Sequence, residues 1–182
     1  MPSSADKKAT TRLFREAKEA SAAWNLAKTA LQTSVFWTVL LFLVPGLLVR
    51  IEAMLGVPSF APQRAVGIAV FVVASALGLW SGATMAVLGQ GTPLPLDTAR
   101  NLVIRGPYAW VRNPMAIAGL AQGAGVGLAL GSWGVLLYVL AGGLLWHTLV
   151  RPVEEADLAA RFGASFEQYR RAVRCWWPRW RR

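Results

Sequence analysis

The sequence is poor in the residues that build disulfide-stapled or metal-dependent small proteins. It has one cysteine, Cys175, and one histidine, His147, among 182 residues. A single cysteine excludes a disulfide framework within the chain and a cysteine-based structural metal site. A single histidine also argues against a zinc or di-iron centre. We therefore expect no bound metal.

Acidic residues are also scarce, with nine Asp and Glu against 19 Lys and Arg, and the net charge is +10. Such a surplus is compatible with binding to nucleic acid or to a membrane surface. The basic residues flank apolar segments, including the Trp- and Arg-rich C-terminus, which favours anchoring to anionic headgroups. We expect a membrane as partner and no nucleic acid.

Apolar residues dominate instead: 55% of the chain is hydrophobic, and its mean hydropathy is +0.42. These values are typical of a small integral membrane protein. Met1 to Ala30 is polar and basic without an apolar core, so we expect no cleaved targeting segment. Four apolar segments approach the ~20 residues that cross a bilayer as a helix, and they are residues 32–49, 65–89, 114–131 and 133–150.

The expected fold is an all-α integral membrane protein with four transmembrane helices, an N-terminal surface helix and a cytoplasmic C-terminal helix. All Lys and Arg except Arg50 and Arg64 lie before the first, between the second and third, or after the fourth segment. This asymmetry predicts that both termini are cytoplasmic. A composition rich in Ala, Gly and Arg points to a bacterial inner (plasma) membrane.

Three regions result from this topology. Residues 1–31 form a cytoplasmic amphipathic segment with a surface helix over Ala5–Ala30, which is either a topogenic tail or a binding element. Residues 32–150 form the four-span domain, with a cytoplasmic loop over residues 90–114. Residues 151–182 form a cytoplasmic helix and a basic, Trp-rich tail.

The third apolar segment carries a glycine at every fourth position, which places these residues on one ridge of a helix. Such a ridge lets another helix approach closely, and packing alone is a sufficient explanation. A role in making room for a ligand stays open. The four glycines are Gly119, Gly123, Gly127 and Gly131.

Two cytoplasmic stretches are not explained by anchoring alone. The loop over residues 91–114 reads GTPLPLDTARNLVIRGPYAWVRNP, and its prolines forbid a continuous helix. The segment that begins at Arg151 reads RPVEEADLAARFGASFEQYRRAV and has acids in its first turn, where the helix dipole favours them. Acids beside a bilayer are costly unless they are paired, so they are functional candidates.

The two stretches together resemble a family of membrane methyltransferases that includes isoprenylcysteine carboxyl methyltransferase and the phospholipid methyltransferases. The family pattern is G-P-Y-x-x-x-R-(H/N)-P-x-Y-x-G, two helices, and then E-E-x-x-L-x-x-x-F-G-x-x-Y-x-x-Y, with V-P-R-x-x-P near the end. The similarity covers roughly residues 90–178, in the same order.

The resemblance implies a methyltransferase that uses S-adenosylmethionine and a lipophilic or lipid-linked acceptor. The acceptor is a prenylcysteine-like carboxylate, a thiol or a phospholipid amine. The resemblance places Arg151 and Glu155 in catalysis, with Arg151 orienting the acceptor. The residues that it implies for cofactor binding are Tyr108, Arg112, Asn113, Pro114, Glu154 and Glu155.

The sequence departs from the family pattern at three places. Ala116 replaces the tyrosine, Ala118 replaces the glycine, and Val173-Arg174-Cys175 replaces V-P-R. The altered positions Ala116 and Ala118 motivate an alternative in which the chain is a catalytically silent family member that acts as a membrane interaction protein. A purely structural four-helix protein is a third interpretation. His147 is either a pocket residue or a packing residue.

Overall fold

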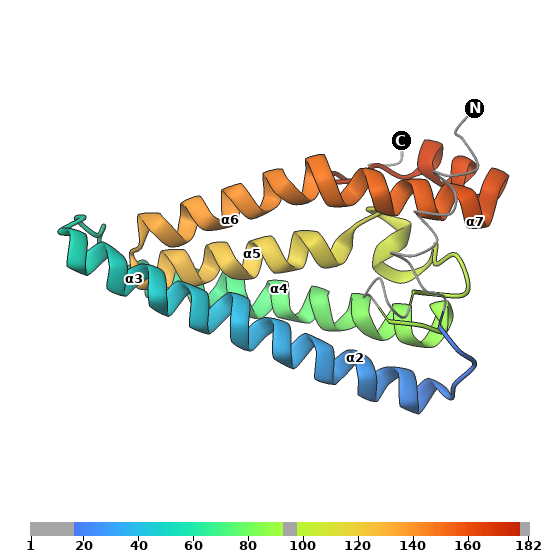
Figure 1. The fold of residues 1–182 in the computed structure, drawn as a ribbon, viewed down its shortest axis with the longest axis horizontal. Helices are drawn as coiled ribbons and strands as arrows, with labels where there is room; N and C mark the ends of the chain where they lie inside the picture. Colours follow the sequence, from blue (N-terminus) through green and yellow to red (C-terminus); the bar gives the residue numbers. More distant parts are fainter. Residues whose placement is uncertain (1–16, 93–97, 179–182) are drawn as a thin grey trace, which may run out of the picture. The chain divides into compact units, whose positions relative to one another are not determined.

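The computed structural model describes residues 17–92 and 98–178, and all regular elements of these residues are helices (Figure 1). The α-helices are α2 (Ala22–Trp37), α3 (Val44–Leu55), α4 (Arg64–Thr84), α5 (Pro114–Leu130), α6 (Trp133–Leu145) and α7 (Arg151–Ala172). The π-helices are η1 (Thr38–Leu43), η2 (Met85–Gly89) and η5 (Trp146–Val150), and η4 (Gly106–Ala109) is a 3-10 helix.

Three continuous helical stretches of the described residues are long and apolar enough to cross a membrane. They are Ala22–Leu55, Arg64–Gly89 and Trp133–Ala172. The charged end of the last stretch, α7, lies beyond the apolar segment 133–150. Helix α5 is apolar but has only 17 residues. The expected all-helical membrane architecture is therefore confirmed, whereas the fourth span and the cytoplasmic placement of the termini stay predictions.

Pro45 does not break the first stretch. The π-helix η1 precedes it, and Pro45 lies in the first turn of α3. A proline ring clashes with the carbonyl of the preceding helical turn, and a widened π turn gives that ring room. The helical stretch thus passes Pro45 by a change of helix type.

The predicted surface helix over Ala5–Ala30 is not observed as a separate element. Residues 5–16 lie outside the described part of the chain, and residues 17–21 are not helical. The helix begins at Ala22, where the Ser21 hydroxyl accepts a hydrogen bond from the Trp24 amide at 3.2 Å. It then continues into the first apolar segment because no glycine or proline lies before Val44.

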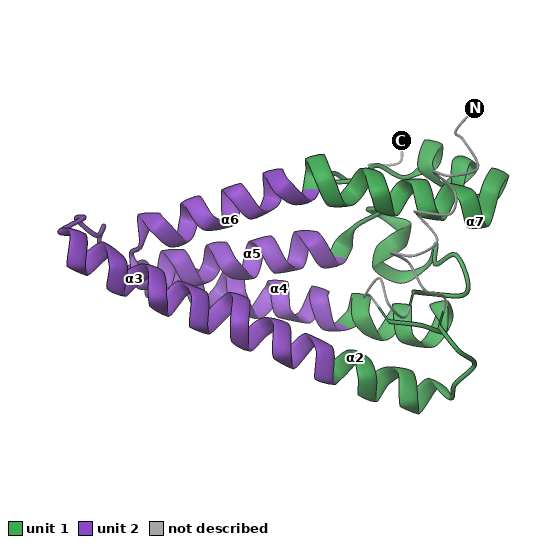
Figure 2. Ribbon diagram, in the orientation of Figure 1, with its two compact units in different colours: residues 1–30, 80–114, 147–182 green, residues 31–79, 115–146 purple. Residues whose placement is uncertain are grey.

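The chain divides into two compact units, each assembled from separate parts of the sequence (Figure 2). Unit 1 contains the described residues of 1–30, 80–114 and 147–182. Unit 2 contains residues 31–79 and 115–146. Both stretches with family-like motifs belong to unit 1, apart from the residues after Pro114.

Unit 2 is held together by close contact between helix backbones. A Cβ atom added to Gly125 of α5 would lie 2.7 Å from the carbonyl oxygen of Gly67 in α4. This approach is possible only because both residues lack side chains. The Gln122 amide donates a hydrogen bond to the Ser75 hydroxyl at 2.9 Å, which adds a polar link between the same two helices.

The glycine ridge of α5 packs as predicted at two of its positions. A Cβ atom on Gly123 would meet Val139 at 2.6 Å, and one on Gly127 would meet Leu136 at 2.7 Å, both in α6. Gly119 has nothing within 4 Å of such an atom. The packing explanation of the ridge is therefore confirmed for Gly123 and Gly127.

A carboxylate fastens the turn between α5 and α6 to α3. Glu52 accepts hydrogen bonds from the Ser132 hydroxyl and the Gly134 amide, both at 2.5 Å. The Ser132 hydroxyl in turn accepts one from the Val135 amide at 3.0 Å and so caps α6. Gly131 makes the turn possible with a φ of 68°.

Candidate active site

The segment GPYAWVRNP forms an ordered wall at the start of α5. Gly106 adopts a φ of 59°, and a Cβ atom there would lie 3.1 Å from the Thr84 hydroxyl. Pro107 lies in the first turn of η4, in which Tyr108 is buried. The Trp110 ring meets Trp80 edge to face, with 5.8 Å between centroids. The prolines and glycine that anchoring left unexplained therefore set this local geometry.

Arg112 connects this wall to α7 and to the chain after it. Its Nη2 donates to Glu155 Oε1 at 2.8 Å, and its Nη1 donates to the carbonyls of Arg170 and Val173, both at 2.9 Å. Its backbone amide donates to the Arg174 carbonyl at 3.0 Å. The guanidinium is largely buried, so these charge-assisted bonds fix its position.

Glu155 is shared by two guanidinium groups. Besides Arg112, the Arg151 Nη1 lies 3.6 Å from the same Oε1 atom, and the Arg151 Nε donates to the His147 carbonyl at 3.3 Å. Two positive charges thus face one carboxylate. Buried Arg112 Nε has no hydrogen-bond partner among the described residues. The two guanidinium groups therefore exceed the charge of Glu155 by one, and one buried donor stays unpaired among the described residues.

The neighbouring acid has different surroundings. Glu154 makes no ion pair or hydrogen bond with another described residue. Burial, and next the charge of Glu155, raises the pKa of Glu154 to about 7. Tyr108 is near enough for the Glu154 charge to raise the pKa of its phenol, although burial is the larger cause. Burial and a like-charged neighbour therefore favour the protonated form of Glu154.

Two buried aromatic residues of α7 support the wall from behind. The Tyr169 hydroxyl donates to the Tyr108 carbonyl at 2.7 Å. Phe166 is 1% exposed, and its ring lies 6.5 Å from that of Tyr169. Burial raises the pKa of the Tyr169 phenol, against the opposing charge of Arg112. Tyr169 thus remains a neutral hydrogen-bond donor.

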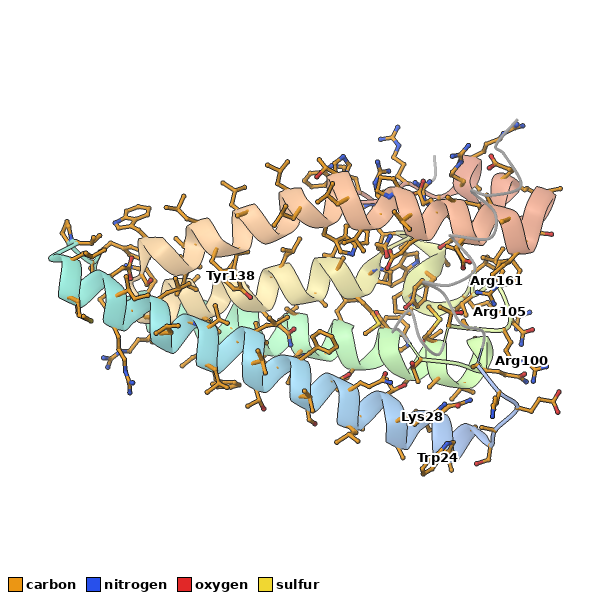
Figure 3. The ribbon with its side chains drawn as sticks, viewed as in Figure 1. Trp24, Lys28, Arg100, Arg105, Tyr138 and Arg161 are labelled. Atoms are coloured by element: carbon orange, nitrogen blue, oxygen red, sulfur yellow. The ribbon has the colours of Figure 1, made fainter. Side chains whose placement is uncertain are left out.

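A second arginine fastens α7 to the loop that precedes the wall. Arg161 Nη1 donates to Thr98 Oγ1 at 3.1 Å, and Arg161 Nη2 donates to the Ala99 carbonyl at 2.5 Å. Asp157 accepts from the same guanidinium at 3.3 Å. Figure 3 labels Arg161, which lies on α7 in unit 1. Asp157 and Arg161 are four residues apart, and this spacing was the only sequence feature that could have indicated their ion pair on a helix.

The chain after α7 folds back onto the wall. Cys175 is buried, and the Asn113 side chain lies close to its thiol. The Trp176 indole donates to His147 Nδ1 at 3.0 Å. His147 is therefore at least a hydrogen-bonded structural residue. Sequence analysis did not predict the contacts of Cys175 and Trp176, because this segment differs from the V-P-R of the family pattern.

The structure brings together most of the residues that sequence analysis selected. Arg112 and Arg151 both contact Glu155. Asn113 lies beside Cys175, and Glu154 is near enough to Tyr108 to act on it electrostatically. Pro114 is fully buried at the first position of α5. Their roles in catalysis and in cofactor binding stay predictions.

The two alanines that depart from the family pattern lie in unit 2. Ala118 is 1% exposed, and its Cβ lies 3.4 Å from where a Cβ on Gly78 would stand. A tight contact between α4 and α5 thus explains the small residue at this position. The structure gives no comparable contact for Ala116.

The model of one protein family, phospholipid methyltransferase, matches residues 62–165, which is more than half of the chain. The chain belongs to the phospholipid methyltransferase family. No curated protein gives a significant match. The resemblance noted in the sequence is therefore confirmed, and family membership supports a membrane-associated methyltransferase with lipid-type substrates.

The family match includes Arg112, Glu154 and Glu155 but ends before Tyr169 and the returning segment 173–176. Arg112 bonds to main-chain atoms of this later part of the chain. The hydrogen bonds of Arg112 therefore reach residues outside the matched region.

Proposed function

We propose that the chain transfers a methyl group from S-adenosylmethionine to a lipophilic or lipid-linked acceptor at the cytoplasmic membrane face. Membership in the phospholipid methyltransferase family supports the reaction class. We place the site where Arg112 and Arg151 contact Glu155, because these contacts join the two stretches with family-like motifs.

The donor set fits this cofactor. S-adenosylmethionine has a carboxylate, and the guanidinium groups of Arg112 and Arg151 exceed the charge of Glu155 by one. Arg151 would hold that carboxylate, with the wall of Tyr108, Asn113 and Pro114 beside it. Glu154 would face the cationic part of the ligand.

When bound, S-adenosylmethionine supplies a methyl group on a positively charged sulfur. The task of the protein is then to align the acceptor and to exclude water. Arg112 helps to align the acceptor because its four hydrogen bonds fix the wall against α7 and the residues that follow α7. Buried Tyr108 and Phe166 would help to exclude water, because both side chains are shielded from solvent.

We include a fourth membrane span in the proposal. Helix α5 is apolar along its 17 residues, and the basic residues flanking the helices follow the positive-inside pattern. A helix of this length spans ~25 Å, which suits a slightly thinned bilayer. Both termini would then be cytoplasmic.

Calorimetric titration of the purified protein with S-adenosylmethionine tests the proposal. We expect saturable binding, and transfer of labelled methyl groups into a total lipid extract or a panel of thiols and carboxylates. Absence of binding at about millimolar cofactor, a free energy near −4 kcal/mol, would favour the catalytically silent interaction protein instead.

A further inference from the structure

Three of the four hydrogen bonds that Arg112 donates are accepted by main-chain carbonyls at the end of α7 and after it. Its Nη1 donates to the carbonyls of Arg170 and Val173, both at 2.9 Å. Its backbone amide donates to the carbonyl of Arg174 at 3.0 Å. Every residue carries a carbonyl, so position alone decides which carbonyls can bind Arg112. The place of the guanidinium therefore depends on how this part of the main chain is held.

Two of these carbonyls lie beyond the regular helix. Helix α7 gives way to extended backbone at Val173, with a φ of −118° and a ψ of 129°. The Val173 amide still donates to the Tyr169 carbonyl at 2.9 Å, but the carbonyls of Val173 and Arg174 bond to Arg112. Helix geometry does not place these two carbonyls, so contacts of the returning segment 173–176 must fix them.

A pair of side chains fastens the returning segment to η5, directly before α7. The Trp176 indole donates to His147 Nδ1 at 3.0 Å, and the two ring centroids lie 5.9 Å apart. The bond is partly buried, which reduces competition from water. The His147 carbonyl also accepts a hydrogen bond from Arg151 Nε at 3.3 Å. His147 thus contacts both the returning segment and an arginine of the site.

These contacts form a closed ring within unit 1. From His147 the ring passes through Trp176 and the main chain of the returning segment to Arg112. From Arg112 it continues through Glu155 to Arg151, whose Nε donates back to His147. Opening the ring at Trp176 should therefore loosen Arg112 and Arg151 without removing either charge.

We propose that His147 and Trp176 are positioning residues, whose hydrogen bond holds the returning segment so that its carbonyls fix the place of Arg112. This inference rests on the proposed function, because Arg112 and Arg151 serve methyl transfer only if this site binds the cofactor. Neither His147 nor Trp176 touches the reacting atoms, and both act through Arg112. The inference gives a function to the segment in which this chain departs from the V-P-R of the family pattern.

Hydrogen exchange of the Arg112 backbone amide, in protein without cofactor, tests the inference directly. This amide donates to the Arg174 carbonyl, so its protection reports whether the returning segment is docked. Trp176→Phe keeps an aromatic ring but loses the donor to His147. We expect exchange to become about tenfold faster, which is the effect of losing one hydrogen bond. NMR of the protein in detergent, resolved by residue, measures the rate.

Trp177→Phe is the matched control, because Trp177 is the next residue and is 74% exposed. The Arg112 amide should exchange in this variant as in the wild type. The Val135 amide in unit 2, which donates to the Ser132 hydroxyl, should keep its rate in every variant and so verify the fold.

Two substitutions of His147 provide a rescue test. The amide oxygen of asparagine lies near the former place of Nδ1 and can still accept from Trp176, whereas leucine has no acceptor. We expect His147→Asn to retain slow exchange of the Arg112 amide. His147→Leu should exchange as fast as Trp176→Phe.

Cofactor affinity separates positioning from a general loss of stability. In Trp176→Phe we expect the Kd for S-adenosylmethionine to rise about tenfold by calorimetry, again the effect of one hydrogen bond. A merely structural role would lower the folded fraction and leave the Kd of the folded protein unchanged. Arg112→Lys has already lost the carbonyl contacts, so adding Trp176→Phe should weaken binding by less than about twofold more.

Three results would overturn this inference while the proposed function stands. They are wild-type exchange of the Arg112 amide in Trp176→Phe, equally fast exchange in His147→Asn and His147→Leu, and additive losses of affinity in the double variant. A wild-type protein that binds no S-adenosylmethionine would overturn the proposed function, and with it the role of His147 and Trp176, whatever the exchange rates show.

Discussion

The interactions within unit 1 differ in kind from those within unit 2. In unit 1, arginine side chains and a tyrosine hydroxyl bond to main-chain carbonyls far away in sequence, as Arg112 and Tyr169 do. In unit 2, glycines let helix backbones touch, as Gly67 and Gly125 do. Unit 1 therefore depends on particular functional groups, whereas unit 2 depends mainly on the size of its side chains.

This difference indicates that the residues proposed for the chemistry lie in unit 1, whereas unit 2 mainly provides stable helix packing. Directional, charge-assisted hydrogen bonds fix atoms well enough for methyl transfer, which requires aligned reactants. Close packing of small residues gives stability within a bilayer, where lipid offers no hydrophobic driving force between helices. Substitutions in unit 1 should therefore mainly affect activity, and those in unit 2 should mainly affect stability.

The largest expected effect is on activity, from Arg112→Lys. Lysine has a compact ammonium that cannot reach Glu155 and the carbonyls of Arg170 and Val173 together. We expect methyl transfer to fall by about 100-fold or more, as misplacement of the wall by ~1 Å suffices for this loss. Initial rates with labelled cofactor measure it.

Arg105→Lys is the matched control for this prediction. Arg105 lies in the same segment, is exposed, and makes no ion pair with another described residue (Figure 3). Its replacement should leave the rate nearly unchanged. Equal losses in both variants would mean that charge in this segment, and not the hydrogen-bond geometry of Arg112, sustains activity.

In unit 2, Gly125→Ala should give a large loss of stability. The added Cβ would lie 2.7 Å from the Gly67 carbonyl oxygen, and a backbone atom cannot rotate away. Overpacking of this kind costs about 1–3 kcal/mol in the free energy of unfolding. Thermal unfolding in detergent should show the loss as a lower Tm.

Gly119→Ala is the control on the same helix, because nothing lies within 4 Å of its added Cβ. We expect its Tm to stay the same or to rise slightly, since alanine favours helix more than glycine does. A loss equal to that of Gly125→Ala would show that glycine flexibility, and not close approach, matters in α5.

A smaller loss of stability should result from Glu52→Gln, which tests the one charged fastening described for unit 2. The substitution replaces one of the two oxygens that accept from Ser132 and Gly134. We expect a cost of about 1–2 kcal/mol in unfolding free energy, with turnover per folded molecule unchanged. Chemical denaturation measures the first and the rate assay the second.

Arg50→Gln provides the comparison on α3, because Arg50 is exposed and has no ion pair with another described residue. It should unfold like the wild type. If Glu52→Gln abolished turnover while remaining folded, the separation of chemistry from packing between the units would be wrong.

The smallest expected effect comes from Tyr169→Phe in unit 1. The change removes only the hydroxyl that donates to the Tyr108 carbonyl. We expect a loss of about 1 kcal/mol in unfolding free energy and a moderate rise in KM, because the wall is less firmly held. An unchanged KM and Tm would show that Arg112 alone positions the wall.

The sequence predicted the membrane helices because their signal is the mean hydropathy of a long segment, which no single tertiary contact can change. It misjudged the start of the first helix, because an Ala- and Lys-rich segment suits a surface helix as well as an extension of a span. No proline or glycine separates residues 22–30 from the first apolar segment, so one helical stretch runs on to Leu55.

The residue types of the site were also readable from sequence, since Arg112, Glu154 and Glu155 lie in family motifs. Only the tertiary structure decided their partners. Arg112 bonds to carbonyls 58 and 61 residues away, and every residue carries a carbonyl, so no sequence pattern marks those partners. The different environments of Glu154 and Glu155 likewise arise from burial and proximity, which adjacent identical residues cannot encode by themselves.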